Sequence, residues 1–210
     1  MSALSWILIL VVLLSLAYYA YRRQHREFGR ALKRLAEQRV TPDPKARYSS
    51  GGLTSYPRLV VHHSEGPITV SAMASTGARS GAGPVTFARL TLTRISPLQF
   101  KLVRKTRSVQ SLVDSAMHGS ESRPGRVSFQ RRFFIETDSL QDFEHVFSEE
   151  LESVVSNASS ISMVTCGEEV LAANAEGVCT DEQTLLSMSQ CVGRVAEQLA
   201  ELHRKKAGTP

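Results

Sequence analysis

An uncharged apolar stretch at the start of the chain restricts its possible folds more than any other feature. The 19 residues from Ala3 to Tyr21 carry no charge. As a helix rising about 1.5 Å per residue, this stretch is roughly 28 Å long, close to the ~30 Å thickness of the hydrocarbon core of a bilayer. Trp6 lies near one end and three tyrosines lie near the other, where amphipathic rings favour the level of the lipid headgroups. The stretch therefore predicts a signal anchor, an uncleaved helix that crosses the membrane once.

Two other interpretations of the apolar stretch are available. A cleavable signal peptide has positive charge before its apolar run and small residues at its cleavage site. Here only Met1 and Ser2 come first, and residues 18–21 read Tyr-Tyr-Ala-Tyr. A helix buried in a soluble core is the other alternative, but its apolar run is usually about 10–14 residues long. Both alternatives fit these residues less well than a membrane-spanning helix does.

The segment after the apolar stretch is strongly basic. Residues 22–47 contain nine Lys or Arg against three Asp or Glu, a net charge of +6. Lysine and arginine within about 15–20 residues of a span favour the cytoplasmic side of a membrane. We therefore expect the N-terminus outside, the rest of the chain in the cytoplasm, and the basic side chains near anionic lipid headgroups. The residues expected to contact the membrane surface are Arg22, Arg23, Arg26, Arg30, Lys33 and Arg34.

This basic segment also explains the high isoelectric point of about 9.3. The whole chain carries +5, so everything outside residues 22–47 carries −1. A near-neutral domain lacks the electrostatic footprint that binds a phosphate backbone, which argues against a nucleic-acid partner. We expect three parts: a transmembrane helix over residues 1–21, a basic juxtamembrane helix and linker over 22–52, and one cytoplasmic α+β domain over 53–206.

Apolar periodicity indicates how the domain is built. Alternation with a period of two indicates strands in its first half, and a period near 3.6 indicates helices later. Because strands precede helices, we expect an α+β fold, a mostly antiparallel sheet with two or three packing helices. A one-residue slip in the alternation at Ala88-Arg89 suggests a β-bulge. The expected strands are 53–63, 68–74, 85–95, 98–104, 127–137, 161–166 and 170–175, and the expected helices are 108–117, 140–157 after a cap at Asp138 or Ser139, and one from the N-cap Thr180 to about Lys205.

Histidine and cysteine do not form a recognisable metal site. Cys166, Cys179 and Cys191 lack the Cys-x-x-Cys pairs that hold zinc ligands close together. We interpret them as reduced thiols in a cytosolic domain. His62 and His63 are neighbours in an expected strand, where adjacent side chains point to opposite faces and cannot easily share a metal. No metal and no cofactor are expected.

The remaining polar clusters fit catalytic or anion-binding sites poorly. The glycine-rich stretch 76–83 leads into Pro84 and a strand, whereas a phosphate-binding loop leads into a helix N-terminus. No serine lies in a Gly-x-Ser-x-Gly nucleophile elbow. The other clusters are interpreted as solvated surfaces of a helix and a strand: Glu144, Glu149, Glu150, Glu152, and the pair Arg131-Arg132.

These observations predict a non-enzymatic, membrane-tethered binding or scaffold protein without catalytic residues. Its cytoplasmic domain would contact another protein or a second copy of itself, and tethering raises its effective concentration near membrane partners. The alternatives are a sensor of a small ligand or lipid and, in third place, an enzyme with scattered site residues. A deep pocket with convergent polar groups would favour these alternatives, whereas an exposed apolar patch or open sheet edge would favour an interaction module.

Overall fold

A computed structural model describes residues 3–37, 46–52, 55–74, 83–105 and 127–208 of the chain. Their eight strands form one sheet in the order β1-β2-β3-β4-β8-β7-β5-β6, and every neighbouring pair is antiparallel. This arrangement confirms the expected α+β class. The elements are α1 (Ala3–Glu37), β1 (Arg47–Ser49), β2 (Arg58–His63), β3 (Gly66–Ala74), β4 (Pro84–Thr91), β5 (Phe100–Arg104), α3 (Val127–Arg132), β6 (Phe133–Thr137), α4 (Leu140–Val146), α5 (Glu149–Asn157), β7 (Ile161–Cys166), β8 (Val170–Glu176) and α6 (Glu182–Ala207).

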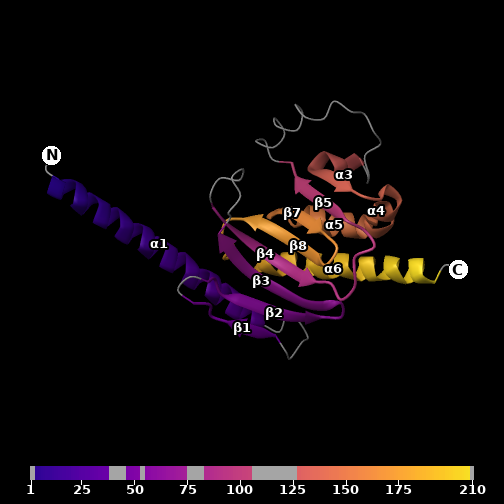
Figure 1. Ribbon diagram of the computed structural model, residues 1–210, viewed down its shortest axis with the longest axis horizontal. Helices are drawn as coiled ribbons and strands as arrows, with labels where there is room; N and C mark the ends of the chain where they lie inside the picture. Colours follow the sequence, from indigo (N-terminus) through magenta and orange to yellow (C-terminus); the bar gives the residue numbers. More distant parts are fainter. Residues whose placement is uncertain (1–2, 38–45, 53–54, 75–82, 106–126, 209–210) are drawn as a thin grey trace.

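Helix α1 is continuous for 35 residues, or roughly 52 Å at 1.5 Å per residue. Its first half projects away from the sheet and its second half lies against it (Figure 1). Apolar side chains from Trp6 to Leu16 are 40–66% exposed, whereas Phe28 and Leu32 are fully buried. Among the described residues, α1 is the one helix long and apolar enough to cross a membrane. The basic helix therefore continues the apolar stretch directly into the domain.

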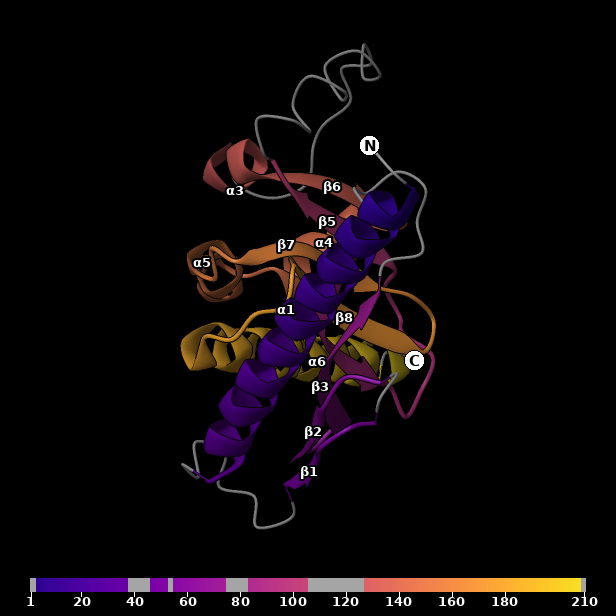
Figure 2. The ribbon, with the colours of Figure 1, turned by 90° about the vertical axis from the view of Figure 1, so that its left-hand side faces the viewer.

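The helices pack on one face of the sheet. Figure 2 shows α3, α5 and the beginning of α6 to the left of the strands. A row of paired, fully buried residues crosses the sheet beneath this helical layer: Val70, Ala88, Ala173, Val164 and Leu102. The second half of α1 contributes to the same core. The expected domain boundary at residue 53 stays a prediction, but the core extends into the expected juxtamembrane helix.

The strand expected over 127–137 is wrong in its first half. Residues Val127–Arg132 form the helix α3, and only Phe133–Thr137 form a strand. The physical reason is the spacing of Phe129 and Phe133, which are four residues apart and both buried, with ring centroids 4.8 Å apart. The residues between them are polar, so the first half lacks the alternation that a half-buried strand needs.

The helix expected over 140–157 is divided in two. Phe147 ends α4 with φ −88° and ψ 68°, and Ser148 begins α5 with φ −60° and ψ 166°. The break lets the rings of Phe143 and Phe147 stack with centroids 4.3 Å apart, and both meet Phe100 edge-on. The expected cap is confirmed at Ser139, whose side chain accepts a hydrogen bond from the backbone N–H of residue 142.

Smaller differences concern the ends of elements. Strand β1 lies in the expected linker, β2 begins at Arg58, β4 ends at Thr91 and β5 begins at Phe100. Helix α6 starts after Asp181, whose carboxylate accepts a hydrogen bond from the backbone N–H of residue 184 at 2.8 Å, so Thr180 is not its N-cap. The expected hairpin of β7 and β8 is confirmed. The helix expected over 108–117 lies outside the described residues.

The alternation slip in β4 is not a bulge. The pairing of β4 with β3 and β8 continues without a register shift. Val85 and Phe87 instead face the side of the sheet opposite the helices, while Ala88 and Leu90 alternate with Arg89 and are fully buried beneath the helices. Apolar residues therefore occupy both faces of this central strand. The slip was predicted because a half-buried strand was expected to have apolar residues on one face only.

Candidate functional site

A small aromatic cluster joins the apolar half of α1 to the domain. The ring of Tyr56, just before β2, stacks on His25 with centroids 5.6 Å apart and meets Tyr21 and Phe28 edge-on at 5.9 and 6.3 Å. Nε2 of His25 lies 3.0 Å from the carbonyl oxygen of Ser55. Burial raises the pKa of the Tyr56 phenol. These contacts hold the domain in one position relative to α1, immediately after the expected span.

The close approach of α1 to the domain depends on a glycine. A Cβ atom at Gly29 would lie 3.0 Å from the hydroxyl oxygen of Tyr48 in β1 and 3.3 Å from the ring Cγ of Pro57. The carbonyl oxygen of Pro57 accepts a hydrogen bond from the buried Ser71 hydroxyl at 2.9 Å, which holds this segment in place. Local sequence reasoning missed the junction because its partners are far apart in the chain.

The six basic residues expected at the membrane surface are all exposed on α1, but their surroundings differ. Arg22, Arg26 and Arg30 are spaced four residues apart, form one stripe along the helix, and have no acidic partner within the described part of the chain. The others form ion pairs: Arg23 with Glu27 at 2.9 Å, Lys33 with Glu37 at 3.6 Å, and Arg34 with Glu182 of α6 at 3.2 Å.

Distance along α1 separates these residues further. If the helix is perpendicular to the bilayer, Arg22 and Arg26 lie within about 8 Å of Tyr21, whereas Lys33 and Arg34 lie about 18–20 Å from it. Attraction to an anionic surface falls off within a Debye length, about 8 Å at physiological salt. Membrane contact by all six residues stays a prediction, and the geometry favours the first turn after Tyr21.

The face of the sheet opposite the helices carries an apolar strip. The registers of the central strands align a row of half-buried residues across five strands: Phe87, Asn174, Met163, Val103 and Phe134. We call this row the apolar strip. Beside it, Met73 is 56% exposed. Arg47 and Arg89 are exposed on the same face and have no acidic partner among the residues described here. The strip and its arginines resemble an interaction surface.

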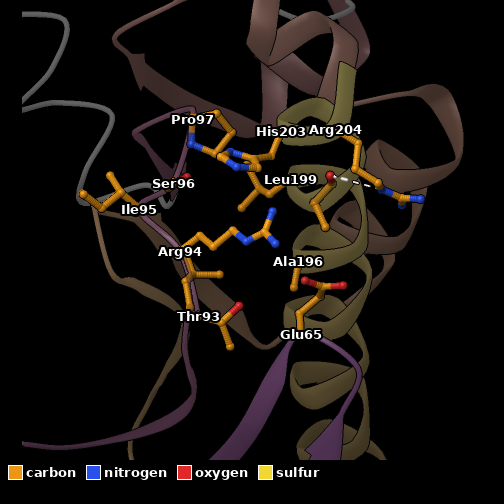
Figure 3. A pocket seen from close by; sticks show the side chains of 12 residues that line it. Glu65, Thr93, Arg94, Ile95, Ser96, Pro97, Ala196, Leu199, His203 and Arg204 are labelled. Carbon is orange, nitrogen blue, oxygen red and sulfur yellow. Dashed lines mark hydrogen bonds between the residues drawn. The ribbon is translucent and has the colours of Figure 1, made fainter. Parts of the chain in front are cut away.

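A cavity of about 240 Å³ lies between the C-terminal half of α6 and the connection from β4 to β5. Figure 3 shows Arg94 pointing into it over Ala196 and Leu199, with Glu65 and His203 at its edges. Ligand pockets usually measure about 300–1,000 Å³, so this cavity is small. Its size and its exposed Arg94 suit a small anionic group better than an enclosed organic ligand.

The three cysteines lie at separate places in the fold. Cys191 of α6 and Cys166 of β7 are buried, and burial raises their pKa to about 12 and about 11. Burial also raises the pKa of the half-buried Cys179. A thiol with a raised pKa stays protonated near pH 7 and is a poor nucleophile or metal ligand. Within the described ranges, no group of three or more His, Cys, Asp or Glu could hold a metal ion.

The other sequence candidates also lie apart from one another. His62 is exposed, and Nε2 of the partly buried His63 lies 3.4 Å from a carboxylate oxygen of Glu197 in α6. Residues 75–82 of the glycine-rich stretch lie outside the described residues. Glu152 is buried, unlike the solvated position expected for it. The exposed candidates are Glu144, Glu149, Glu150, Arg131 and Arg132, the last two on α3 and not on a strand.

Comparison with known proteins identifies a fold but not a family. No protein-family model and no curated protein matches this chain. A similar solved structure is the crystal structure of the mycobacterial trehalose monomycolate transport factor A, TtfA, with a TM-score of 0.52 and 9% identity over 83% of this chain and 95% of that chain. At this identity the likeness shows the fold alone. The apolar helix and this fold fit a membrane-anchored α+β protein.

Proposed function

We propose that this chain is a single-pass membrane protein whose cytoplasmic domain binds another protein beside the bilayer, without catalysing a reaction. The observation that carries the proposal is the continuity of α1. Its exposed apolar half suits a bilayer, and its second half belongs to the domain core. A domain attached in this way cannot swing freely on a linker, so the same surface always faces the same region near the membrane.

The apolar strip is the surface proposed to bind the partner. It is half-buried and crosses five strands, Arg89 lies beside it two residues from Phe87 in β4, and Arg47 is farther away on β1 of the same face. A complementary surface would combine apolar side chains with Asp or Glu, because opposite charges across an interface favour association and specific orientation. The partner proposed is therefore a membrane-associated protein with an acidic and apolar surface.

Photo-cross-linking tests this binding surface directly. A benzoyl-phenylalanine at Met73, which is exposed beside the strip, is expected to give one dominant protein adduct in intact membranes. The same group at Arg194, exposed on the opposite, helical layer, serves as the matched control. The adduct should disappear for the Arg194 position. Adduct yields that are equal at the two positions would contradict the proposal, and an adduct of two identical chains would identify the partner as a second copy.

The proposed orientation has its own expected result. A reporter enzyme that is active only outside the cytoplasm, fused after Pro210, should be silent. Replacing Arg22, Arg23 and Arg26 with glutamine should weaken the orientation bias, because these are the cations nearest to the span. A fluorescent protein that folds in the cytoplasm, fused at the same place, provides the positive control. An active external reporter on the unmodified chain would show that the domain lies on the other side.

The cavity beside α6 favours a second candidate function, the binding of a small ligand or lipid. Arg94 and His203 could bind an anionic group there, over the apolar floor of Ala196 and Leu199. The solved structure of similar fold is named as a transport factor for trehalose monomycolate, which is compatible with this second candidate. The small volume of the cavity makes protein binding the first choice.

A further inference from the structure

We infer that a cavity at the junction of α1 and the β1–β2 connection binds the phosphate group of an anionic phospholipid. The cavity measures about 190 Å³ and is lined by Tyr18, Tyr21, Arg22, His25, Arg26 and Gly52. We call it the headgroup cavity. The inference rests on the proposed anchoring by α1, and it adds a specific ligand site to what was expected to be a diffuse attraction between cations and lipid.

The charge of the headgroup cavity is one-sided. Two arginines line it and no carboxylate does. Arg22 and Arg26 are one helical turn apart, and neither forms an ion pair within the described part of the chain. The guanidinium carbon of Arg22 lies 5.4 Å from the centre of the Tyr18 ring, which limits its motion. Guanidinium groups present paired N–H donors that match phosphate oxygens, so two of them here suit one phosphate.

The other wall of the cavity includes His25, which belongs to the aromatic cluster around Tyr56. Nε2 of His25 lies 3.0 Å from the carbonyl oxygen of Ser55 and must donate in this contact, because a carbonyl oxygen only accepts. The ring is also stacked on Tyr56. These two contacts restrain the His25 ring. One wall of the cavity is therefore preorganised, and preorganisation favours binding.

The level of the cavity selects a lipid as the source of the phosphate. Tyr18 and Tyr21 belong to the aromatic end of the expected span, where such rings lie among the headgroups. Arg22 and Arg26 follow within about one and a half helical turns, so they lie at the depth of the lipid phosphates. A phosphatidylglycerol-like lipid carries net negative charge there, whereas phosphatidylcholine carries none. Soluble phosphate shares the chemistry but lacks a reason to concentrate at this level.

Native mass spectrometry of the full-length protein tests the inference. The protein is purified in a neutral detergent and exposed to equal amounts of phosphatidylglycerol and phosphatidylcholine, and the retained lipids are counted. The unmodified protein should retain phosphatidylglycerol preferentially. The double variant Arg22→Gln/Arg26→Gln should lower this preference roughly 25-fold, about fivefold for each cation removed. Circular dichroism checks that the variant stays folded, as expected for exposed residues.

The matched control removes the same charge farther from the membrane. The variant Lys33→Gln/Arg34→Gln should keep the lipid preference within about twofold, because these cations lie beyond the screening length. If Arg23→Gln, which removes a cation at the same depth that does not line the cavity, lowers the lipid preference as much as Arg22→Gln does, the inference is overturned in favour of diffuse attraction; no loss in the double variant would also overturn it. Displacement of the lipid by millimolar glycerol phosphate would assign the cavity to soluble phosphates. Release of the unmodified protein from membranes by alkaline carbonate would instead contradict the anchoring itself, so the two failures can be distinguished.

Discussion

The variant Arg104→Met is expected to lower the free energy of unfolding by about 3 kcal/mol and the melting temperature by about 6–12 °C. Arg104 ends β5, and its guanidinium carbon lies 4.6 Å from the centre of the Phe133 ring. It donates hydrogen bonds to backbone carbonyl oxygens around the C-terminus of α5: Ile161 at 2.8 Å, Ala158 at 2.9 Å, Val155 at 3.1 Å and Ser156 at 3.4 Å. Thermal unfolding followed by circular dichroism in neutral detergent measures the change.

The expected loss is large because methionine would leave four backbone carbonyl oxygens without the donor that Arg104 provides. The last carbonyl groups of a helix have no partner within the helix, and a cation nearby also opposes the negative end of the helix dipole. Hydrogen bonds to a charged group contribute about 1.5–3 kcal/mol, and a buried acceptor without a donor costs about 1–3 kcal/mol more. Burial and the nearby Arg132 lower the pKa of Arg104, but arginine stays charged at neutral pH.

Two further variants separate hydrogen bonding from charge. Arg104→Lys keeps the positive charge but cannot reach several carbonyls at once, so we expect a loss of roughly half that of methionine. Arg89→Met removes an exposed arginine from the opposite face of the sheet and should change stability by less than about 0.5 kcal/mol. If Arg104→Met and Arg89→Met have the same melting temperature, the capping role assigned to Arg104 is wrong.

The variant Phe28→Ala is expected to cost about 3–5 kcal/mol and to loosen the attachment of the domain to α1. Phe28 is fully buried and contacts Tyr56 edge-on, so alanine leaves a cavity at the junction. Tyr56 would keep its ring contacts with Tyr21 and His25. We therefore expect the junction to open locally before the whole domain unfolds. Hydrogen exchange should therefore speed up first in residues 28–36 and in β2, which packs on α1.

A change within the apolar half of the same helix provides the control. Tyr19 is 69% exposed and lies outside the domain core, so Tyr19→Ala should leave the melting temperature of the domain unchanged. Its hydrogen exchange in residues 28–36 should also match the unmodified protein. If Phe28→Ala behaves like Tyr19→Ala, then α1 is an appendage of the domain and the rigid attachment proposed for binding does not exist.

Sequence reasoning reached the fold class because its signals are local. The uncharged stretch, the strand alternation around β3 and the hairpin of β7 and β8 each depend on residues close together in the chain. The error over residues 127–132 has a local part, the four-residue spacing of Phe129 and Phe133, and a part that distant contacts decide. Phe129 and Phe147, whose ring centroids lie 5.9 Å apart, come from α3 and the end of α4, and this packing favours a helix where a strand was expected. Arg104 offered a signal that was not used, since it continues the inward alternation of Phe100 and Leu102.

By itself, the amino-acid sequence determined that residues 3–21 are apolar and long enough to span a membrane, that the segment behind them is basic, and that the rest has the α+β class. Hydropathy, charge and periodicity are properties of short segments, so they can be recognised without knowing which distant residues a segment contacts. Only the tertiary structure decided that α1 enters the core, that Arg22 and Arg26 line a cavity with His25 and that the apolar strip forms on one face of the sheet. These features depend on residues that folding brings together, and burial and register become visible only then.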